Sequence, residues 1–265
     1  MRIPFTQVDA FADEAFGGNP AAVMPLSAWL PDETLQAIAA ENNLSETAFL
    51  IPADGGEADF ELRWFTPTTE VELCGHATLA SGHVVLRSEP TRERVTFVTR
   101  KAGLLEVALD ALGYAMALPA YPAEPKPLPA ILAALGLEQA VATLWHPSAY
   151  ALVVVEDEAA VRALRPDFRA LAREGDVLTI VTAPGSETDV VSRVFACGAG
   201  IDEDPVTGSA HCVLTPYWTQ RLDRDGFTAH QASVRGGRLT CRSEGDRVVL
   251  GGRCVTVIEG VFLLP

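Results

Sequence analysis

The chain has 265 residues, of which 48% are hydrophobic and 21% are charged, and its formal net charge is -15. This composition is typical of a globular protein with one large or two smaller domains, and the acidic balance argues against a nucleic-acid partner. No apolar run approaches the roughly 20 residues that span a bilayer, and the first residues lack a secretion signal, so we expect a cytoplasmic protein without membrane contact. Five cysteines without a CxxC pair indicate free thiols and no metal site.

The first half of the chain predicts alternating helices and short strands. Pro31, followed by Asp32 and Glu33, begins a helix that runs to about Asn43, because proline suits the first helical position and acids suit the first turn. The elements expected next are strands at 46–52 and 59–65, a helix from Gly75 to about Arg87, and strands at 94–100, 104–110 and 114–119.

The second half predicts the same order of elements. We expect helical segments between Glu158 and Arg173, strands at 177–181 and 190–196, a helix from about Thr207, and short strands to the end. The segment from Pro119 to Pro129 has five prolines, which are poorly tolerated inside a helix or sheet, so it is the expected linker. The chain thus divides into an N-terminal lobe of residues 1–118 and a C-terminal lobe of residues 119–265. The sequence leaves undecided whether the last strand packs on the first lobe.

Three short matches indicate an internal duplication. They come in the same order and at nearly constant offsets of 130, 133 and 134 residues: Arg63-Trp64-Phe65 with Arg193-Val194-Phe195, Cys74-Gly75-His76-Ala77 with Thr207-Gly208-Ser209-Ala210, and, more loosely, residues 102–105 with residues 236–239. The predicted fold is therefore α+β, with two pseudo-symmetric lobes.

Each lobe places a glycine at the start of an apolar helix, Gly75 in the first and Gly208 in the second. Backbone N–H groups at a helix start lack intrahelical partners and attract anions. Two such starts facing each other would form a site for a small carboxylate, with the side chains of His76 and Ser209 at equivalent positions. The expected substrate-binding positions are Gly75, Ala77, Gly208 and Ala210.

The chain resembles the PhzF-like proteins, which are phenazine-biosynthesis-type isomerases with a diaminopimelate epimerase-like fold. The resemblance covers nearly the whole chain and rests on several ordered motifs: VDAFADEAFGGNPAAV from Val8, NNLSETAFL from Asn42, CGHATLASGHVV from Cys74, IDEDPVTGSAH from Ile201 and GGRCVTVIEG from Gly251. It implies a cofactor-independent isomerase and, in each lobe, a curved mixed sheet or barrel around a central helix. It also implies an active site between the lobes and a homodimer.

Carried onto this sequence, the resemblance makes Glu46 the proton carrier and implies that His76, Asp204 and Ser209 position the substrate and assist proton transfer. The residues alone leave other interpretations open: a solvated carboxylate for Glu46, turn chemistry before a proline for Asp204, a buried helix-end histidine for His76, and a helix-start hydroxyl for Ser209. At an offset of 130, the counterpart of Glu46 is Asp176.

Cys74 separates the possible classes of enzyme. Related epimerases and proline racemase-like enzymes are expected to bring one thiol from each lobe, but the position symmetric to Cys74 holds Thr207. A two-thiol racemase is therefore disfavoured, and a single carboxylate that moves a proton on one face of a small carboxylate substrate is the simplest hypothesis. Two alternatives stay open: a one-sided epimerase that uses Cys74, or a noncatalytic protein that binds a small anion. No residue selects a particular substrate.

Overall fold

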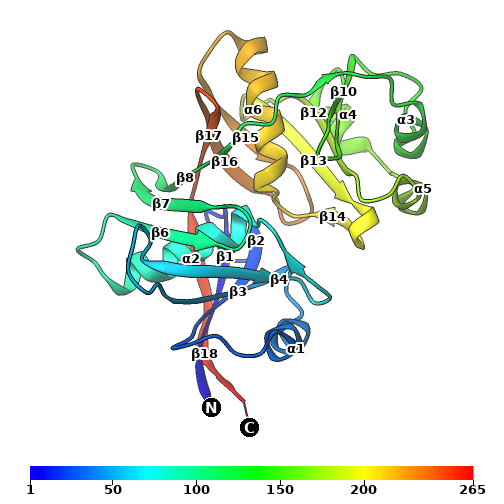
Figure 1. The fold of residues 1–265 in the computed structure, drawn as a ribbon. Coiled ribbons are helices and arrows are strands. Elements are labelled where there is room, and N and C mark those ends of the chain that lie inside the picture. The colour runs from blue at the N-terminus through cyan, green and yellow to red at the C-terminus, as the bar shows by residue number, and fades with distance from the viewer. Residues whose placement is uncertain (265) are drawn as a thin grey trace. The chain divides into compact units, whose positions relative to one another are not determined.

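A computed structural model describes residues 1–264, which form two compact units (Figure 1). Unit 1 comprises Met1–Ala117 and the segment from Gly251 on, and unit 2 comprises Leu118–Leu250. The last strand, β18 (Cys254–Leu263), pairs antiparallel along the whole of β1 (Arg2–Ala10). The sequence range of 119–265 for the second lobe is therefore too long at its C-terminal end, and the last strand packs on the first lobe.

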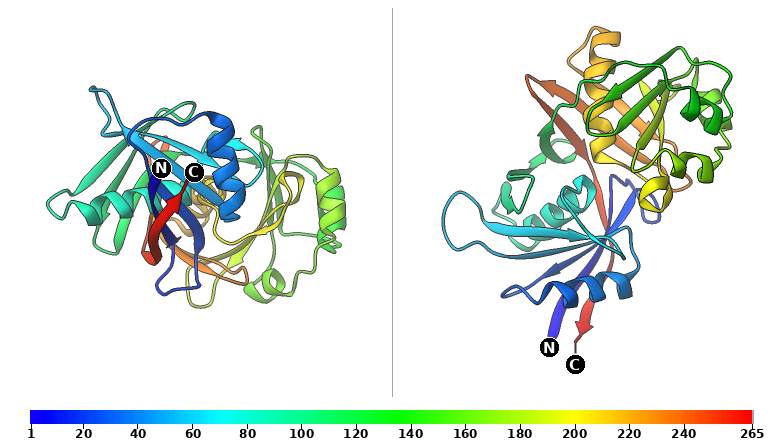
Figure 2. Two further views of the ribbon diagram at one scale, coloured as in Figure 1. Left: turned by 90° about the horizontal axis from the view of Figure 1, so that it is seen from below. Right: turned by 45° about the vertical axis from the view of Figure 1, so that its right-hand side comes forward.

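Unit 1 is a mixed sheet around a central helix. Its further strands are β2 (Asn19–Pro25), β3 (Glu46–Pro52), β4 (Phe60–Phe65), β5 (Glu70–Val71), β6 (Arg94–Thr99), β7 (Leu104–Asp110) and β8 (Gly113–Pro119), the last of which leads into unit 2. The pairs β2–β3 and β4–β6 are parallel, and the remaining neighbours in the order β18, β1, β2, β3, β4, β6, β7 and β8 are antiparallel. Helix α2 (Gly75–Ser88) contacts strands across this sheet, and α1 (Asp32–Asn42) covers the other face (Figure 2).

The central position of α2 follows from its small side chains. Its residues from Gly75 to His83 are all buried, and its hydroxyls donate to the helix itself: Thr78 Oγ1 to the Cys74 carbonyl at 2.6 Å and Ser81 Oγ to the Ala77 carbonyl at 2.7 Å. A Cβ atom at Gly82 would lie 2.4 Å from Cγ1 of Val107 on β7, so only glycine lets helix and sheet approach this closely.

Unit 2 repeats this plan around α6 (Gly208–Leu222), which contacts β11, β15 and β16. Its strands are β9 (Glu124–Pro125), β10 (Ala142–His146), β11 (Tyr150–Val154), β12 (Leu178–Pro184), β13 (Val190–Ala196), β14 (Ile201–Asp204), β15 (Gly226–Gln231), β16 (Gly237–Glu244) and β17 (Arg247–Gly252). The outer helices are α3 (Pro129–Leu135), α4 (Glu158–Ala163) and α5 (Phe168–Arg173), and a short 3-10 turn, η1 (Cys197–Ala199), follows β13. The prediction of an α+β fold with a curved mixed sheet around a central helix in each lobe is confirmed.

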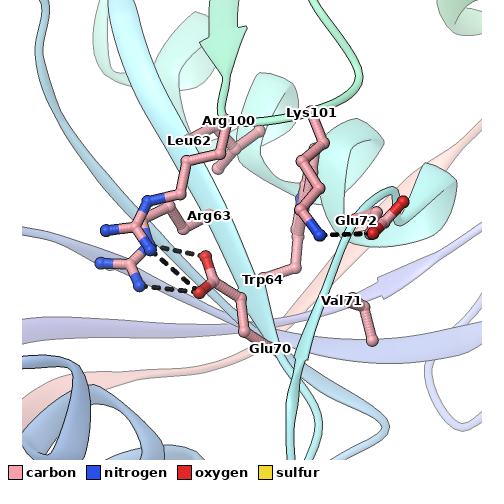
Figure 3. A pocket seen from close by; sticks show the side chains of 8 residues that line it. All are labelled: Leu62, Arg63, Trp64, Glu70, Val71, Glu72, Arg100 and Lys101. Carbon is pink, nitrogen blue, oxygen red and sulfur yellow. Dashed lines mark hydrogen bonds and ion pairs between the residues drawn. The ribbon is translucent and has the colours of Figure 1, made fainter.

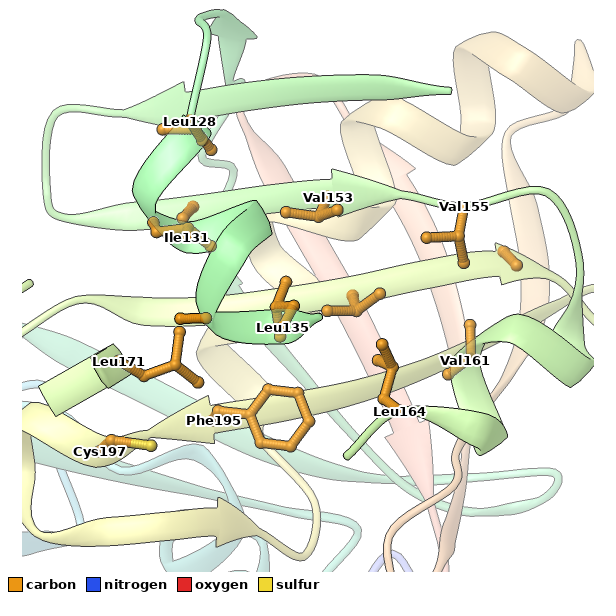
Figure 4. Packing of buried hydrophobic residues seen from close by; sticks show 14 of the residues in the cluster. Leu128, Ile131, Leu135, Val153, Val155, Val161, Leu164, Leu171, Phe195 and Cys197 are labelled. Carbon is orange, nitrogen blue, oxygen red and sulfur yellow. The ribbon is translucent and has the colours of Figure 1, made fainter. Parts of the chain in front are cut away.

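The core on the outer face of unit 2 joins all three outer helices to the sheet (Figure 4). Leu135 of α3, Val161 of α4 and Leu171 of α5 pack with Val153 of β11 and Phe195 of β13. The proline-rich segment also belongs to unit 2, because β9 lies inside it and pairs antiparallel with β10. Residues 119–129 are therefore part of the second unit and not a free linker.

Matching polar clusters show the duplication more clearly than the sequence did. Arg63 holds Glu70 through two hydrogen bonds of 2.7 and 2.9 Å, and Arg193 holds Glu203 through two of the same lengths. A second pair of motifs agrees: Asp59 accepts from the amide and hydroxyl of Thr96 at 2.8 and 2.9 Å, and Asp189 accepts from Thr228 at the same distances.

The sheet register corrects the predicted counterpart of Glu46. Thr47 of β3 pairs with Phe65 of β4, and Thr179 of β12 pairs with Phe195 of β13. The residue before each threonine is Glu46 in unit 1 and Leu178 in unit 2. Leu178, and not Asp176, is therefore the counterpart of Glu46, so unit 2 has no carboxylate at this position.

Candidate active site

Three candidate functional side chains of unit 1 meet where β3 and α2 begin. Oε2 of Glu46 lies 2.9 Å from Nε2 of His76, and Sγ of Cys74 lies 3.5 Å from Nδ1 of the same ring. The His76 and Cys74 residues are buried, and the Glu46 side chain is only 12% exposed. The contact with His76 is a close ion pair without hydrogen-bond geometry, so Oε2 of Glu46 is a buried acceptor without a hydrogen-bond donor among residues 1–264.

The turn before β2 positions the histidine ring. The side-chain amide of the fully buried Asn19 lies 3.2 Å from Nδ1 of His76 and would present its oxygen to the charged ring, since both nitrogens of an imidazolium donate. Gly18, just before it, has a φ of +62°, and a Cβ there would lie 2.2 Å from the Ala10 carbonyl oxygen. A glycine is needed for this close approach, and Asn19 is a site residue that the sequence analysis did not identify.

The buried groups favour a charged His76 beside a neutral Cys74. Burial alone would lower the pKa of His76, but the contacts with Cys74 and the carboxylate of Glu46 act in the opposite direction, and the net direction of its pKa is well upward. For Cys74, burial and then the charge of Glu46 raise the pKa of the thiol to about 11. At neutral pH the cysteine is therefore a thiol, and the charge that favours the imidazolium of His76 comes from the Glu46 carboxylate.

We expect Cys74 to resist alkylation near neutral pH. The thiolate is the nucleophile, and a thiol pKa of about 11 leaves little thiolate at pH 7 to 8. Peptide mass spectrometry after iodoacetamide treatment should show slow labelling of Cys74 that accelerates as the pH approaches 11. Rapid labelling of Cys74 in the folded protein at pH 7 would contradict this assignment.

In unit 2, a buried glutamine organises the turn before α6. Oε1 of Gln231 accepts from the Thr207 amide at 2.9 Å, while its Nε2 donates to the carbonyl of Asp204 at 2.8 Å and to Oγ1 of Thr207 at 3.1 Å. The Thr207 hydroxyl donates in turn to the Asp204 carboxylate. Gln231 is fully buried, so these contacts fix the Asp204 turn, and no sequence motif had pointed to this residue.

Ser209 lies beside an aromatic cluster of unit 2. Burial raises the pKa of Tyr150 to about 12, and a hydrogen bond with Ser209 opposes this shift. The ring of Tyr121 stacks on His146 at a centroid distance of 4.9 Å and lies 5.6 Å from the ring of Tyr150. Ser209 is thus next to Tyr150, another residue that the sequence analysis missed.

His211, one turn into α6, is a neutral buried histidine. Nδ1 lies 2.8 Å from the Thr207 carbonyl and must donate to it, which leaves Nε2 as a buried nitrogen without a hydrogen-bond partner among residues 1–264. Burial lowers the pKa of His211 to about 4. The ring therefore stays uncharged at neutral pH and ties together the first turn of α6.

Acidification should destabilise the protein through His211. The pKa of His211 is near 6.5 in an unfolded chain and about 4 in the fold. The stability gained by keeping the ring neutral is therefore complete above pH 6.5 and is lost as the pH falls toward 4. Between pH 7 and pH 5, the unfolding free energy of the wild type should fall by about 2 kcal/mol more than that of His211→Gln. Urea denaturation at the two pH values measures this difference, and equal losses would contradict it.

Neither central helix has a side-chain cap at its N-terminal end. Cys74 precedes α2 and Thr207 precedes α6, and neither side chain accepts a hydrogen bond from its helix. The amide groups of the first turn can therefore still bind an anion, as the sequence predicted. The structure brings Glu46, His76, Gly75 and Ala77 together in unit 1, and it places Asp204, Ser209, Gly208 and Ala210 at the start of α6 in unit 2.

A cavity of about 120 Å³ in unit 1 is separate from these centres (Figure 3). Its charged side chains are already paired, Arg100 with Glu70 at 3.1 Å and Lys101 with Glu72. Neither Glu46 nor the start of α2 lines it; the lining residues are Leu62, Arg63, Trp64, Glu70, Val71, Glu72, Arg100 and Lys101.

Comparison with known proteins decides the family. A PhzC-PhzF family model, described as phenazine biosynthesis-like protein, matches residues 8–260. The chain belongs to the PhzC-PhzF family. An uncharacterized isomerase from Pseudomonas aeruginosa is 50% identical over 263 residues, which cover 98% of each chain. The human phenazine biosynthesis-like domain-containing protein is 39% identical over 288 residues, which cover 99% of each chain.

Solved structures agree with this assignment. The crystal structure of a PhzF family phenazine biosynthesis protein from Enterococcus faecalis matches all of both chains, with a TM-score of 0.91 and 42% identity. A hydroxyproline epimerase from Agrobacterium vitis shares the fold at a TM-score of 0.62 and 12% identity, over 98% of this chain and 92% of that one. The chain is an isomerase of the PhzC-PhzF family. Within residues 1–264, no helix combines the length and the apolar character needed to cross a membrane.

Proposed function

We propose that the chain is a cofactor-independent isomerase that moves a proton between two atoms of a small carboxylate-bearing metabolite, with Glu46 as the acid-base group. The observation that carries this proposal is the buried oxygen Oε2 of Glu46, which has no hydrogen-bond donor among residues 1–264 and lies 2.9 Å from Nε2 of His76. A carboxylate oxygen kept from water and without a donor is suited to accept a proton from a substrate.

The proposed reaction uses one proton and one carboxylate. Glu46 removes a proton from carbon and becomes a carboxylic acid, while the electron pair moves into the conjugated part of the substrate. The same acid then returns the proton to a second atom, which restores the carboxylate. The positive charge favoured on His76 holds Glu46 in place and favours the negative charge that develops on the substrate.

Unit 2 repeats neither the carboxylate of Glu46 nor the thiol of Cys74 at the corresponding positions, which favours isomerisation over epimerisation. Leu178 occupies the position that corresponds to Glu46, and Thr207 occupies the position that corresponds to Cys74. Burial raises the pKa of Cys74 to about 11, which makes this thiol a poor base at neutral pH. A single carboxylate moves a proton on one face, whereas inversion at a carbon needs a second group on the other face.

We assign the substrate carboxylate to the start of α2, where the amide groups near Gly75 and Ala77 would donate to its oxygens. We further propose a cytoplasmic homodimer, with neither nucleic acid nor a membrane as a partner.

The test is incubation of the pure protein with a metabolite extract in deuterated water, followed by mass spectrometry. A metabolite that gains deuterium with the wild type and with Glu41→Gln, an exposed-glutamate control on α1, but not with Glu46→Gln would support the proposal. Labelling that persists in Glu46→Gln would refute the role of Glu46. A metabolite that is retained by the protein without chemical change would instead identify a noncatalytic anion binder.

A further inference from the structure

The side chains of Glu46, Cys74 and His76 form a set of three different metal-ligand types. One ligand atom from each residue lies within 4.8 Å of the other two. Nε2 of His76 lies 2.9 Å from Oε2 of Glu46 and 4.0 Å from Sγ of Cys74. All three come from the starts of β3 and α2 and are held by the surrounding core of unit 1.

These separations are close to those of a tetrahedral zinc site. Bond lengths of about 2.0 Å to nitrogen or oxygen and 2.3 Å to sulfur place neighbouring ligand atoms roughly 3.3 to 3.6 Å apart. The observed distances of 2.9 and 4.0 Å lie on either side of that range. Because Sγ of Cys74 lies nearer to Nδ1 of His76, at 3.5 Å, the Cys74 side chain must rotate toward Nε2 for the site to form. A thiolate with an imidazole and a carboxylate suits Zn²⁺ or Cd²⁺ and does not suit Mg²⁺ or Ca²⁺.

We propose that Glu46, Cys74 and His76 bind one Zn²⁺ or Cd²⁺ ion per chain. The ion replaces the thiol proton of Cys74 and any proton on the ligating nitrogen of His76, and these protons leave to solvent without a change in oxidation state. Three protein ligands leave the fourth tetrahedral position to water. Such an ion would be an inhibitor and not a cofactor, because it occupies the oxygen of Glu46 that the proposed function needs; only this inhibitory consequence rests on that function.

The internal duplication supplies a control within the chain. The corresponding positions in unit 2 hold Leu178, Thr207 and Ser209, which lack a thiol, an imidazole and a carboxylate. Elsewhere in the described part of the chain, residues 1–264, no other group of three His, Cys, Asp or Glu side chains meets the same distance criterion. The proposal therefore predicts one ion per chain, bound in unit 1.

Titration of Cd²⁺ into the metal-free full-length protein tests the site, because cadmium–thiolate bonds absorb in the ultraviolet. The wild type should develop this band with saturation at one ion per chain, and added Zn²⁺ should displace Cd²⁺ and remove the band. Cys74→Ser should not develop it, whereas Cys254→Ser, a change to another cysteine of unit 1, should keep it. His76→Gln and Glu46→Gln should each bind the ion at least about tenfold more weakly, since loss even of an outer-shell partner typically costs that much.

Other outcomes would overturn the proposal. A wild type without the band, or a Cys74→Ser variant that keeps it while circular dichroism shows a native fold, excludes this site. These measurements need no turnover, so their failure leaves the isomerase proposal intact. If the ion binds but Zn²⁺ does not suppress the deuterium labelling described above, the inhibitory consequence is wrong.

Discussion

Replacing Glu46 with glutamine is expected to lower the rate of proton transfer by about 10²- to 10⁴-fold, the usual contribution of a general acid-base group. Glutamine keeps the size of the side chain and removes its basicity. The effect should fall on kcat, with KM little changed, because the lost interaction is made in the transition state and not in the ground state. The measurement is the rate of deuterium incorporation from solvent into the substrate that the extract screen identifies.

The control for this variant is Glu41→Gln, which removes an exposed carboxylate from α1 and should keep the wild-type rate. Circular dichroism should show the same fold for both variants. A Glu46→Gln protein that keeps more than a tenth of the wild-type rate would show that another group carries the proton. The thiol of Cys74 would then be the first candidate, as its 3.5 Å contact with His76 suggests.

The elements that carry the site were predictable because their signals are local. The strand expected at 46–52 is β3, the strand expected at 190–196 is β13, and the helices expected from Gly75 and about Thr207 are α2 and α6. Each begins at a glycine or at a short apolar run with polar residues before it, so the boundaries depend on neighbouring residues alone. The fold class followed from the repeated order of these elements.

The arrangement within the site was less predictable, since it depends on the pairing of distant segments. Glu46 and His76 are 30 positions apart in the sequence, and only the resemblance to PhzF-like proteins had linked them. Gln231 lies at the end of β15 and had no signal, because a glutamine in a strand is ordinarily half-exposed and here it is fully buried. For Asn19, the two glycines before it were a weak sequence signal of a tight turn.

The wrong counterpart of Glu46 has a simple geometric cause. Thr47 precedes its partner Phe65 by 18 positions, whereas Thr179 precedes Phe195 by 16. The loop between the paired strands is therefore two residues shorter in unit 2, and the offset of 130 that holds at Phe65 becomes 132 at Thr47. A repeat found by short matches fixes the register only within the matched strand, so a neighbouring strand needs its own match.

Replacing Arg193 with methionine is expected to lower the unfolding free energy by about 3 kcal/mol, because removal of one partner leaves the other charge buried without compensation. The Arg193 side chain is 11% exposed and that of Glu203 is 16% exposed. The guanidinium also donates to the carbonyl of Leu164 at 3.0 Å, which would lose this donor. Methionine keeps most of the length of the side chain, so the change tests the charge more than the packing. Urea denaturation at pH 7 measures the loss.

The duplicated cluster in unit 1 is the matched control. Arg63 is itself more buried, at 2% exposed, but its partners Glu70 and Asp32 are 30% and 62% exposed and can regain water when the guanidinium is removed. Arg63→Met should therefore cost less than Arg193→Met. The double change Arg193→Met with Glu203→Leu should recover more than half of the loss, since replacement of both charges by apolar groups is often close to neutral. Equal losses in the two units, or no recovery in the double variant, would mean that packing and not the unpaired carboxylate sets the cost.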